Sequence, residues 1–147
     1  MRIRFSLGWL KSAQKINKAF KIQSACLLFQ DYTERISRFI PCEVGVYPSK
    51  ARAITWVCER EQKSRQLSSV VLARELENVM ISSAQELQIV IGGPDGFTAG
   101  ELEEMKPVLR WSFGPMTLPH ELAAVVAAEQ IYRALTIIKN HPYHTGH

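Results

Sequence analysis

Residues 87–91 and the glycine-rich turn after them constrain the fold of this chain more than any other segment. The first five residues, LQIVI, predict a buried strand, and GGPDG follows at once at 92–96. Glycines allow a sharp turn whose backbone N–H groups face outward, and α/β proteins bind ligands at the carboxyl ends of their strands. The segment therefore predicts an α/β sheet with a ligand site at this edge. The alternative is an ordinary turn before a helix.

Strand-like and helix-like segments alternate along the rest of the chain. We expect strands at 2–7, 43–47, 54–58, 87–91 and 109–112, a charged loop at 59–65, and helices near 12–39, after Ser68 and Ser69, from Thr98 to Pro107, and from Pro119 to Ile138. This alternation is typical of a mostly parallel sheet with helices on both faces. The chain has no repeat, low-complexity tract or linker, so we expect one α/β domain over 1–147.

Positive charge is concentrated in the first half of the chain. Residues 1–74 hold fourteen Lys and Arg against five Asp and Glu, whereas residues 75–147 hold four against nine. A basic half suits a polyanion such as RNA, although a solvated basic face would look the same. The first thirty residues contain no acid and resemble a transit peptide in this respect. The alternation of polar and apolar residues over 2–7 instead favours a strand.

The cysteines and the hydropathy indicate a cytoplasmic protein that does not enter a membrane. Three cysteines without a Cys-x-x-Cys pair are typical of reduced thiols, and no stretch approaches the length of a membrane span. His141, His144 and His147 have a spacing that could chelate zinc, but the last is at the terminus and no carboxylate is interleaved. We therefore expect no metal.

Two segments near the carboxyl end are candidates for an interface and for chemistry. The last predicted helix is rich in alanine, at positions Ala123, Ala124, Ala127, Ala128 and Ala134. Such an apolar helix must be buried, either in its own domain or in a dimer interface. After it, Tyr143 and His144 form a pair that can handle a proton or contact a base, unless the tail is simply frayed.

Four short sequence motifs together resemble those of one known family. They are IGGPDG at 91–96, MTLPH at 116–120, AEQIYRA at 128–134 and NHPYH at 140–144. In this order and spacing they resemble the carboxyl-terminal half of the RlmH family, the small SPOUT-class methyltransferases of bacterial 23S rRNA. Similarity over residues 1–88 is thinner.

The resemblance implies an α/β fold with a SPOUT-type trefoil knot in a cofactor-binding half at about 85–147. It also implies S-adenosylmethionine as methyl donor, methylation of N3 of a pseudouridine in the 23S rRNA of the ribosome, and a homodimer formed through the alanine-rich helix. The implied cofactor-binding residues are Val57, Gly92, Phe113, Gly114, Pro115, Met116, Thr117 and Leu118. Tyr143 and His144 would be catalytic and would meet the target base across the dimer.

This chain departs from the family pattern at several positions. Thr145 stands where the family usually has Arg or Lys, and Ala124 where it commonly has Arg. A charged run at 59–63 replaces a glycine-containing turn. A second hypothesis is therefore an RNA-binding or ribosome-associated homologue that has lost methyl transfer. A third is a small α/β nucleotide-binding protein unrelated to RNA.

Overall fold

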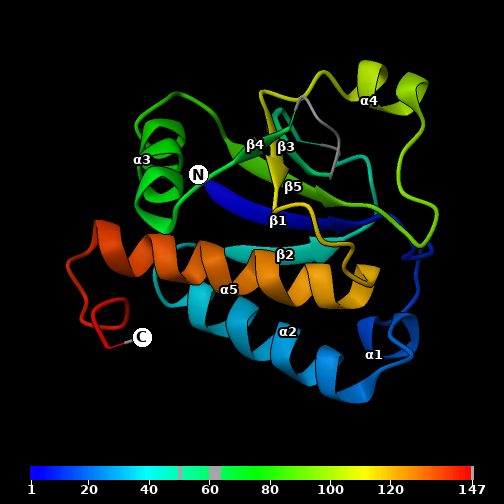
Figure 1. The fold of residues 1–147 in the computed structure, drawn as a ribbon, viewed down its shortest axis with the longest axis horizontal. Helices are drawn as coiled ribbons and strands as arrows, with labels where there is room; N and C mark the ends of the chain where they lie inside the picture. Colours follow the sequence, from blue (N-terminus) through cyan, green and yellow to red (C-terminus); the bar gives the residue numbers. More distant parts are fainter. Residues whose placement is uncertain (50, 60–63, 147) are drawn as a thin grey trace.

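The described residues of the computed structural model, 1–49, 51–59 and 64–146, form a six-stranded parallel sheet with helices around it (Figure 1). The sheet order is β2-β1-β5-β3-β6-β4. The strands are β1 (Arg2–Leu7), β2 (Cys42–Gly45), β3 (Ala53–Cys58), β4 (Arg65–Gln66), β5 (Glu86–Ile91) and β6 (Leu109–Ser112). The helices are α1 (Ile16–Ala19), α2 (Gln23–Ser37), α3 (Ser69–Met80), α4 (Ala99–Met105) and α5 (His120–Ile138). The α/β class with a parallel sheet is confirmed.

Most predicted elements are confirmed, with two corrections. The helix expected near 12–39 is instead two helices, because Phe20 and Ile22 are extended and the ring of Phe20 is buried. The two-residue strand β4 was not predicted, because its exposed polar residues carry no periodic signal. Part of the loop expected at 59–65 lies outside the described residues. The helices expected after Ser68 and from Thr98 are confirmed as α3 and α4; Ser68 and Thr98 cap them, and Thr98 does so in a full capping box.

The main core lies between the sheet and the helix pair α2 and α5. Alternate residues of β1, Ile3, Phe5 and Leu7, are fully buried and belong to this core, as a strand with one apolar face requires. Helix α5 contacts α2, α3 and β5, and Figure 1 shows α2 and α5 side by side below the sheet. Strand β5 is buried along its whole length because it lies between β1 and β3.

The alanines of α5 pack within their own chain. Ala124, Ala127, Ala128 and Ala134 are fully buried, and their small side chains allow α2 and α3 to approach the helix closely. The predicted alternative of burial in the helix's own domain is therefore confirmed for these four residues. Any partner would meet α5 on other residues.

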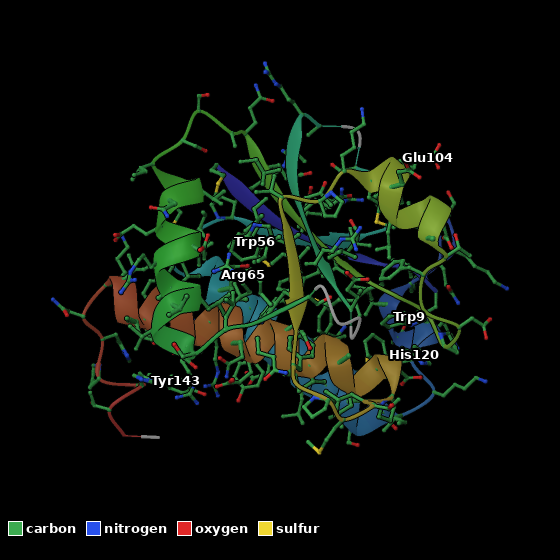
Figure 2. The ribbon with its side chains drawn as sticks, turned by 45° about the horizontal axis from the view of Figure 1, so that its top comes forward. Trp9, Trp56, Arg65, Glu104, His120 and Tyr143 are labelled. Atoms are coloured by element: carbon green, nitrogen blue, oxygen red, sulfur yellow. The ribbon has the colours of Figure 1, made fainter. Side chains whose placement is uncertain are left out.

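The first turn of α5 holds the start of α2. The carboxylate of Glu121 is nearly fully buried and accepts hydrogen bonds from the backbone N–H groups of Lys21 (3.1 Å) and Ile22 (2.9 Å). Helix α2 has no side-chain cap of its own, so Glu121 satisfies backbone donors at this end. Beside it, Trp9 packs edge-on against His120 with ring centroids 4.6 Å apart (Figure 2).

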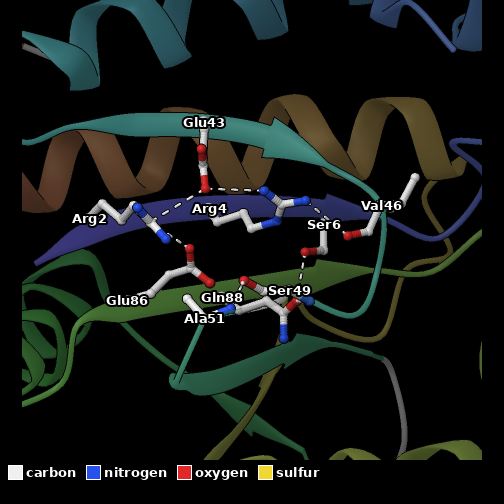
Figure 3. A network of polar contacts seen from close by, with 9 residues as sticks. All are labelled: Arg2, Arg4, Ser6, Glu43, Val46, Ser49, Ala51, Glu86 and Gln88. Atoms are coloured by element: carbon white, nitrogen blue, oxygen red, sulfur yellow. Dashed lines mark hydrogen bonds and ion pairs between the residues drawn. The ribbon is translucent and has the colours of Figure 1, made fainter. Parts of the chain in front are cut away.

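The second face of the sheet is largely polar. At one end α4 covers it with Leu102, which belongs to a small cluster with Val57 and Val90. Elsewhere it carries a network of polar contacts (Figure 3). Its ion pairs join Arg2 Nε to Glu86 Oε1 at 2.8 Å and Arg4 Nη1 to Glu43 Oε1 at 3.1 Å, and the Ser6 hydroxyl donates to Gln88 Oε1 at 2.9 Å. Helices therefore lie on both faces, as expected, but they cover them unequally.

Glu86 is the buried carboxylate of this network. Burial raises its pKa, but the neighbouring Ser49, the hydrogen bond from Arg2 and the charges of Arg2 and Arg4 together outweigh this effect. The net pKa lies below the usual value of 4.5. A carboxylate with a lowered pKa in the folded state stabilises the fold above its unfolded pKa, and this contribution is lost as the pH falls through the folded pKa.

We predict that Glu121→Ala lowers the free energy of unfolding by about 1–3 kcal/mol, because it leaves the backbone N–H groups of Lys21 and Ile22 without their acceptor. Urea denaturation at neutral pH measures this change. Glu103→Ala is the matched control, since Glu103 is an exposed carboxylate of α4. Equal effects of the two substitutions would contradict the role given to Glu121.

We predict that Glu86→Gln is less stable than the wild type at pH 7, and that the gap narrows as the pH falls below about 4.5. Urea denaturation curves at several pH values between 7 and 3 measure the gap, with Glu103→Gln as the control for an exposed carboxylate. A gap that stays constant over this range would show that Glu86 contributes by shape and not by charge.

Candidate functional site

A cleft of about 820 Å³ opens at the carboxyl edge of the sheet. It lies where β3, β5 and β6 end and where α5 begins, which is the edge that the sequence predicts for a ligand. The lining residues are Cys58, Glu59, Ile91, Gly92, Gly93, Pro94, Asp95, Gly96, Phe97, Phe113, Gly114, Met116, Thr117, Leu118, Pro119, His120 and Ala123. Two loops, 92–97 and 113–119, therefore form most of its walls.

The loop after β5 is closed by an aromatic ring over a glycine. A Cβ added to Gly92 would lie 3.0 Å from Cε2 of Phe97, which is closer than real Cβ atoms normally come. The N–H of Gly96 donates to the carbonyl of Gly93 at 3.0 Å and completes the turn. Any side chain at position 92 would therefore push Phe97 or the turn itself out of place.

The loop after β6 depends on a second glycine. Gly114 has φ of +109°, a conformation that L side chains rarely adopt, and its N–H donates to the hydroxyl of Ser112 at 3.1 Å. The ring of Phe113 packs edge-on against Trp111 with centroids 4.8 Å apart. Met116 is 71% exposed, so this apolar side chain stands at the cleft with little of its own chain around it.

The structure brings most of the predicted cofactor residues together in this cleft. Those that line it are Gly92, Phe113, Gly114, Met116, Thr117 and Leu118. Pro115 is exposed and does not line the cleft, and Val57 is fully buried in the cluster under α4. The side chains that line the cleft at the end of β3 are those of Cys58 and Glu59. Because side chains of successive strand residues point to opposite faces of the sheet, an error of one residue in the predicted register changes which side chain of β3 faces the cleft.

Sequence reasoning missed three of the polar lining residues. The carboxylate of Glu59 accepts a hydrogen bond from Ser64 at 3.0 Å and lies 3.5 Å from Nε of Arg110. Burial raises the pKa of the Cys58 thiol, so this group stays neutral and is no nucleophile. His120 lies 3.6 Å from the carboxylate of Glu121. Its place as the last residue of the MTLPH segment at 116–120 was the one available signal.

The predicted catalytic pair lies in a different place, beside the carboxyl half of α5. The Tyr143 hydroxyl donates to Glu129 Oε1 at 3.2 Å, and its ring packs edge-on against Tyr132 at 4.8 Å. Nδ1 of His144 lies 3.1 Å from Nη1 of Arg133. These two side chains are partly buried and hydrogen-bonded, so the alternative of a frayed tail is wrong for them.

Two electrostatic properties of the tail follow from these contacts. Burial, together with the neighbouring Tyr32 and the carboxylate of Glu129, raises the pKa of Tyr143, so its phenol stays protonated. Arginine has donors and no acceptor, so Nδ1 of His144 must accept from Arg133. A neutral His144 ring therefore carries its proton on Nε2. Glu129 in turn fixes Arg133 through contacts of 2.7 Å and 3.0 Å.

Within one chain the tail and the cleft are separated along α5. Arg133, which holds His144, comes thirteen residues after His120, which lines the cleft. At a rise of 1.5 Å per residue this spacing corresponds to about 20 Å along the helix. Figure 2 shows His120 and Tyr143 toward opposite ends of the helix. The cleft of one chain is therefore not completed by its own tail.

The described part of the chain shows neither a metal site nor a membrane span. There, no three His, Cys, Asp or Glu side chains gather in a way that would hold a metal ion. His147, a member of the predicted histidine triad, lies outside that part. None of the helices described is both long and apolar enough to cross a membrane.

Comparison with known proteins identifies the family. Residues 47–144 match the model of a family described as a predicted SPOUT methyltransferase. A protein of Stenotrophomonas maltophilia (strain K279a) named ribosomal RNA large subunit methyltransferase H is 36% identical over 138 residues, which cover 79% of this chain and 86% of the relative. A protein of the same name from Koribacter versatilis is also 36% identical, over 80% of this chain and 86% of the relative.

A further relative matches over a shorter range. The protein of this name from Hydrogenovibrio crunogenus is 36% identical over 84 residues, which are 57% of this chain and 52% of the relative. The family match covers both loops of the cleft and the Tyr143–His144 pair. Because that match spans most of the chain and relatives above 30% identity are covered over 86% of their length, the chain belongs to the SPOUT methyltransferase family.

Proposed function

We propose that the protein transfers a methyl group from S-adenosylmethionine to N3 of a pseudouridine in 23S rRNA. The observation that carries the proposal is the cleft between loops 92–97 and 113–119, because it gathers most of the residues that the family resemblance assigns to the cofactor. Relatives named for methylation of large-subunit ribosomal RNA support the substrate class. A ribosomal substrate implies a cytoplasmic location.

The residues of the cleft fit S-adenosylmethionine. Its volume of about 820 Å³ is in the range of small-molecule sites. Gly92 and Gly114 carry no side chain, so that backbone groups can approach a ligand at one position of each wall. The carboxylates of Glu59 and Asp95 line the cleft and are suited to hydroxyl and ammonium groups. When bound, this cofactor supplies an electrophilic methyl group.

The protein's part in such a reaction is mainly alignment. Methyl transfer is an in-line displacement, so the rate depends on holding donor and acceptor in contact. The target base must leave its stack to reach the cleft. The phenol of Tyr143 stays protonated, so this residue can stack on a base or donate a hydrogen bond to it. Because Nδ1 of His144 faces Arg133, the N–H donor of a neutral His144 is at Nε2, on the other side of the ring. We infer that His144 donates to a carbonyl oxygen of the base, which makes the N3 proton easier to lose to water. The N3–methyl bond would form as the bond between sulfur and methyl in the donor breaks, which leaves a neutral thioether.

A homodimer accounts for the separation of tail and cleft. In a two-fold dimer the tail of one chain can complete the cleft of the other. Helix α5 leaves a stripe that is not fully buried at Leu122, Val126, Glu129, Arg133 and Ile137. Leu122 is 42% exposed, and Leu28 on the neighbouring α2 is 48% exposed. We propose that this stripe and the adjoining face of α2 form the interface, and that a trefoil knot over about 85–147 holds the cleft.

A second candidate is an RNA-binding homologue that has lost methyl transfer. It is favoured by two positions where the family usually has cations. Ala124 is fully buried in its own core, and Thr145 is exposed with its hydroxyl bonded to the carbonyl of Pro142. Calorimetric titration with S-adenosylmethionine, followed by a transfer assay on ribosomes, separates the two. Saturable binding with transfer supports the enzyme, whereas RNA binding without either supports the second candidate.

We predict that Gly92→Val weakens S-adenosylmethionine binding by about ten- to a hundredfold, because the new side chain meets Phe97. Calorimetric titration measures the affinity. Gly100→Val is the matched control, since a Cβ there would meet its nearest neighbour, Thr98 Oγ1, at 4.0 Å. If Gly92→Val has near-normal affinity and an unchanged circular dichroism spectrum, the cofactor does not bind in this cleft.

We predict that His144→Ala slows methyl transfer by about a hundredfold or more and leaves S-adenosylmethionine affinity unchanged. The reason is that His144 would contact the base and not the cofactor. Single-turnover transfer and calorimetric titration are measured on the same preparation, with Thr145→Ala as the control. If rate and affinity fall together, the tail shapes the cleft and takes no part in the chemistry.

A further inference from the structure

Four exposed lysines stand next to the cleft and do not line it. Lys11, Lys15, Lys18 and Lys21 belong to residues 9–21, which we call the lysine segment and which includes α1. Within the described residues none of the four forms an ion pair with an acidic side chain. Four positive charges are therefore free for a partner.

The start of the lysine segment is fixed against one wall of the cleft. The N–H of Gly8 donates to the carbonyl of Ile91 at 2.8 Å, directly before the glycine turn. A Cβ added to Gly93 would lie 3.7 Å from Cβ of Trp9, so the segment begins in contact with that turn. The ring of Trp9 also packs against His120, which lines the cleft.

The end of the lysine segment returns to the same place. The ring of Phe20 is buried and packs edge-on against Trp9 with centroids 5.8 Å apart. The N–H groups of Lys21 and Ile22 donate to Glu121, the residue after His120. Figure 1 shows α1 beside the first turn of α5. Both ends are tied to residues at the cleft, so the lysines between them are held at its rim.

The charges of the rim and of the cleft are opposite in sign. The cleft is lined by Asp95 and by Glu59, whose charge Arg110 partly balances, whereas the lysine segment contains no acid. A polyanion would thus be attracted to the rim and not to the floor of the cleft. Lysine ammonium groups bind phosphates as point charges, and each contact releases a counterion from the nucleic acid.

We propose that the lysine segment binds the phosphate backbone of the RNA whose base enters the cleft. The inference rests on the proposed function, because it takes RNA as the substrate. Lys15 directly precedes α1 and Lys18 lies within it, three residues further on, so we expect their side chains to share one side of this short helix. They are the pair that we expect to contact neighbouring phosphates.

The test compares two double variants that each remove two positive charges. Lys15→Gln/Lys18→Gln changes the lysine segment, and Arg74→Gln/Lys106→Gln changes two exposed cations on α3 and after α4 that form no ion pair in the described residues. Binding of a 23S rRNA hairpin is measured over a range of KCl concentrations. S-adenosylmethionine affinity is measured in parallel, and it should stay at the wild-type value in both variants.

The expected result is that the slope of log affinity against log salt falls by about 1.4–1.8 in the lysine variant and much less in the control. An unchanged slope in the lysine variant would overturn the proposal, as would an equal change in the control. Binding of both double variants to anionic lipid vesicles is measured as well. If the lysine variant loses vesicle binding but keeps RNA binding, the proposal is overturned, and the lysine segment binds a membrane surface instead. If the wild type binds no S-adenosylmethionine but the slope still falls, the phosphate contact stands and the proposed methyl transfer does not.

Discussion

The pairing of β5 with β1 on one side and β3 on the other determines where the cleft can form. Each residue of Glu86–Ile91 has a partner in both neighbouring strands, and all six are buried. Such a strand cannot shift in register without moving its apolar side chains out of the core. The turn that follows it is therefore held in one position at the carboxyl edge of the sheet. Because glycines follow the strand, backbone groups form part of the cleft wall at this edge.

Helix α5 connects the two parts of the proposed site and keeps them apart. Its first residue, His120, lines the cleft, and its later residues Glu129 and Arg133 hold the tail. The buried alanines make the helix part of the core of its own chain, so its position relative to the sheet is fixed. In a monomer the tail would lie about 20 Å along the helix from the cleft and could not contact a ligand there. In a two-fold dimer the tail of each chain could instead reach the cleft of the other. The lysines at the rim would then bring RNA to a site built by both chains.

Local patterns predicted the elements whose signals lie within a few residues. The alternation in β1, the apolar run of β5 and the start of a helix at Thr98 were all predicted from the sequence itself. The break between α1 and α2 at Phe20 was not predicted, because it depends on the packing of the Phe20 ring against Trp9, which no periodic pattern in the sequence indicates. Val57 was expected at the cleft, but a shift of a single residue decides which face a strand side chain points to. The support of His144 by Arg133 is a tertiary contact that no spacing rule gives.

The claim that one chain supplies the cleft and its partner the tail is tested most directly by mixing two impaired variants, one altered in the cleft and the other in the tail. Gly92→Val keeps the tail, and His144→Ala keeps the cleft. After unfolding and refolding of an equal mixture, a heterodimer would hold one intact site, and about a quarter of the wild-type transfer activity should return. At an S-adenosylmethionine concentration well below the wild-type Kd, each variant refolded alone should keep about a tenth of the wild-type activity or less. If the mixture is no more active than the two variants alone, the tail and the cleft do not act across a dimer, and the proposed active site is wrong.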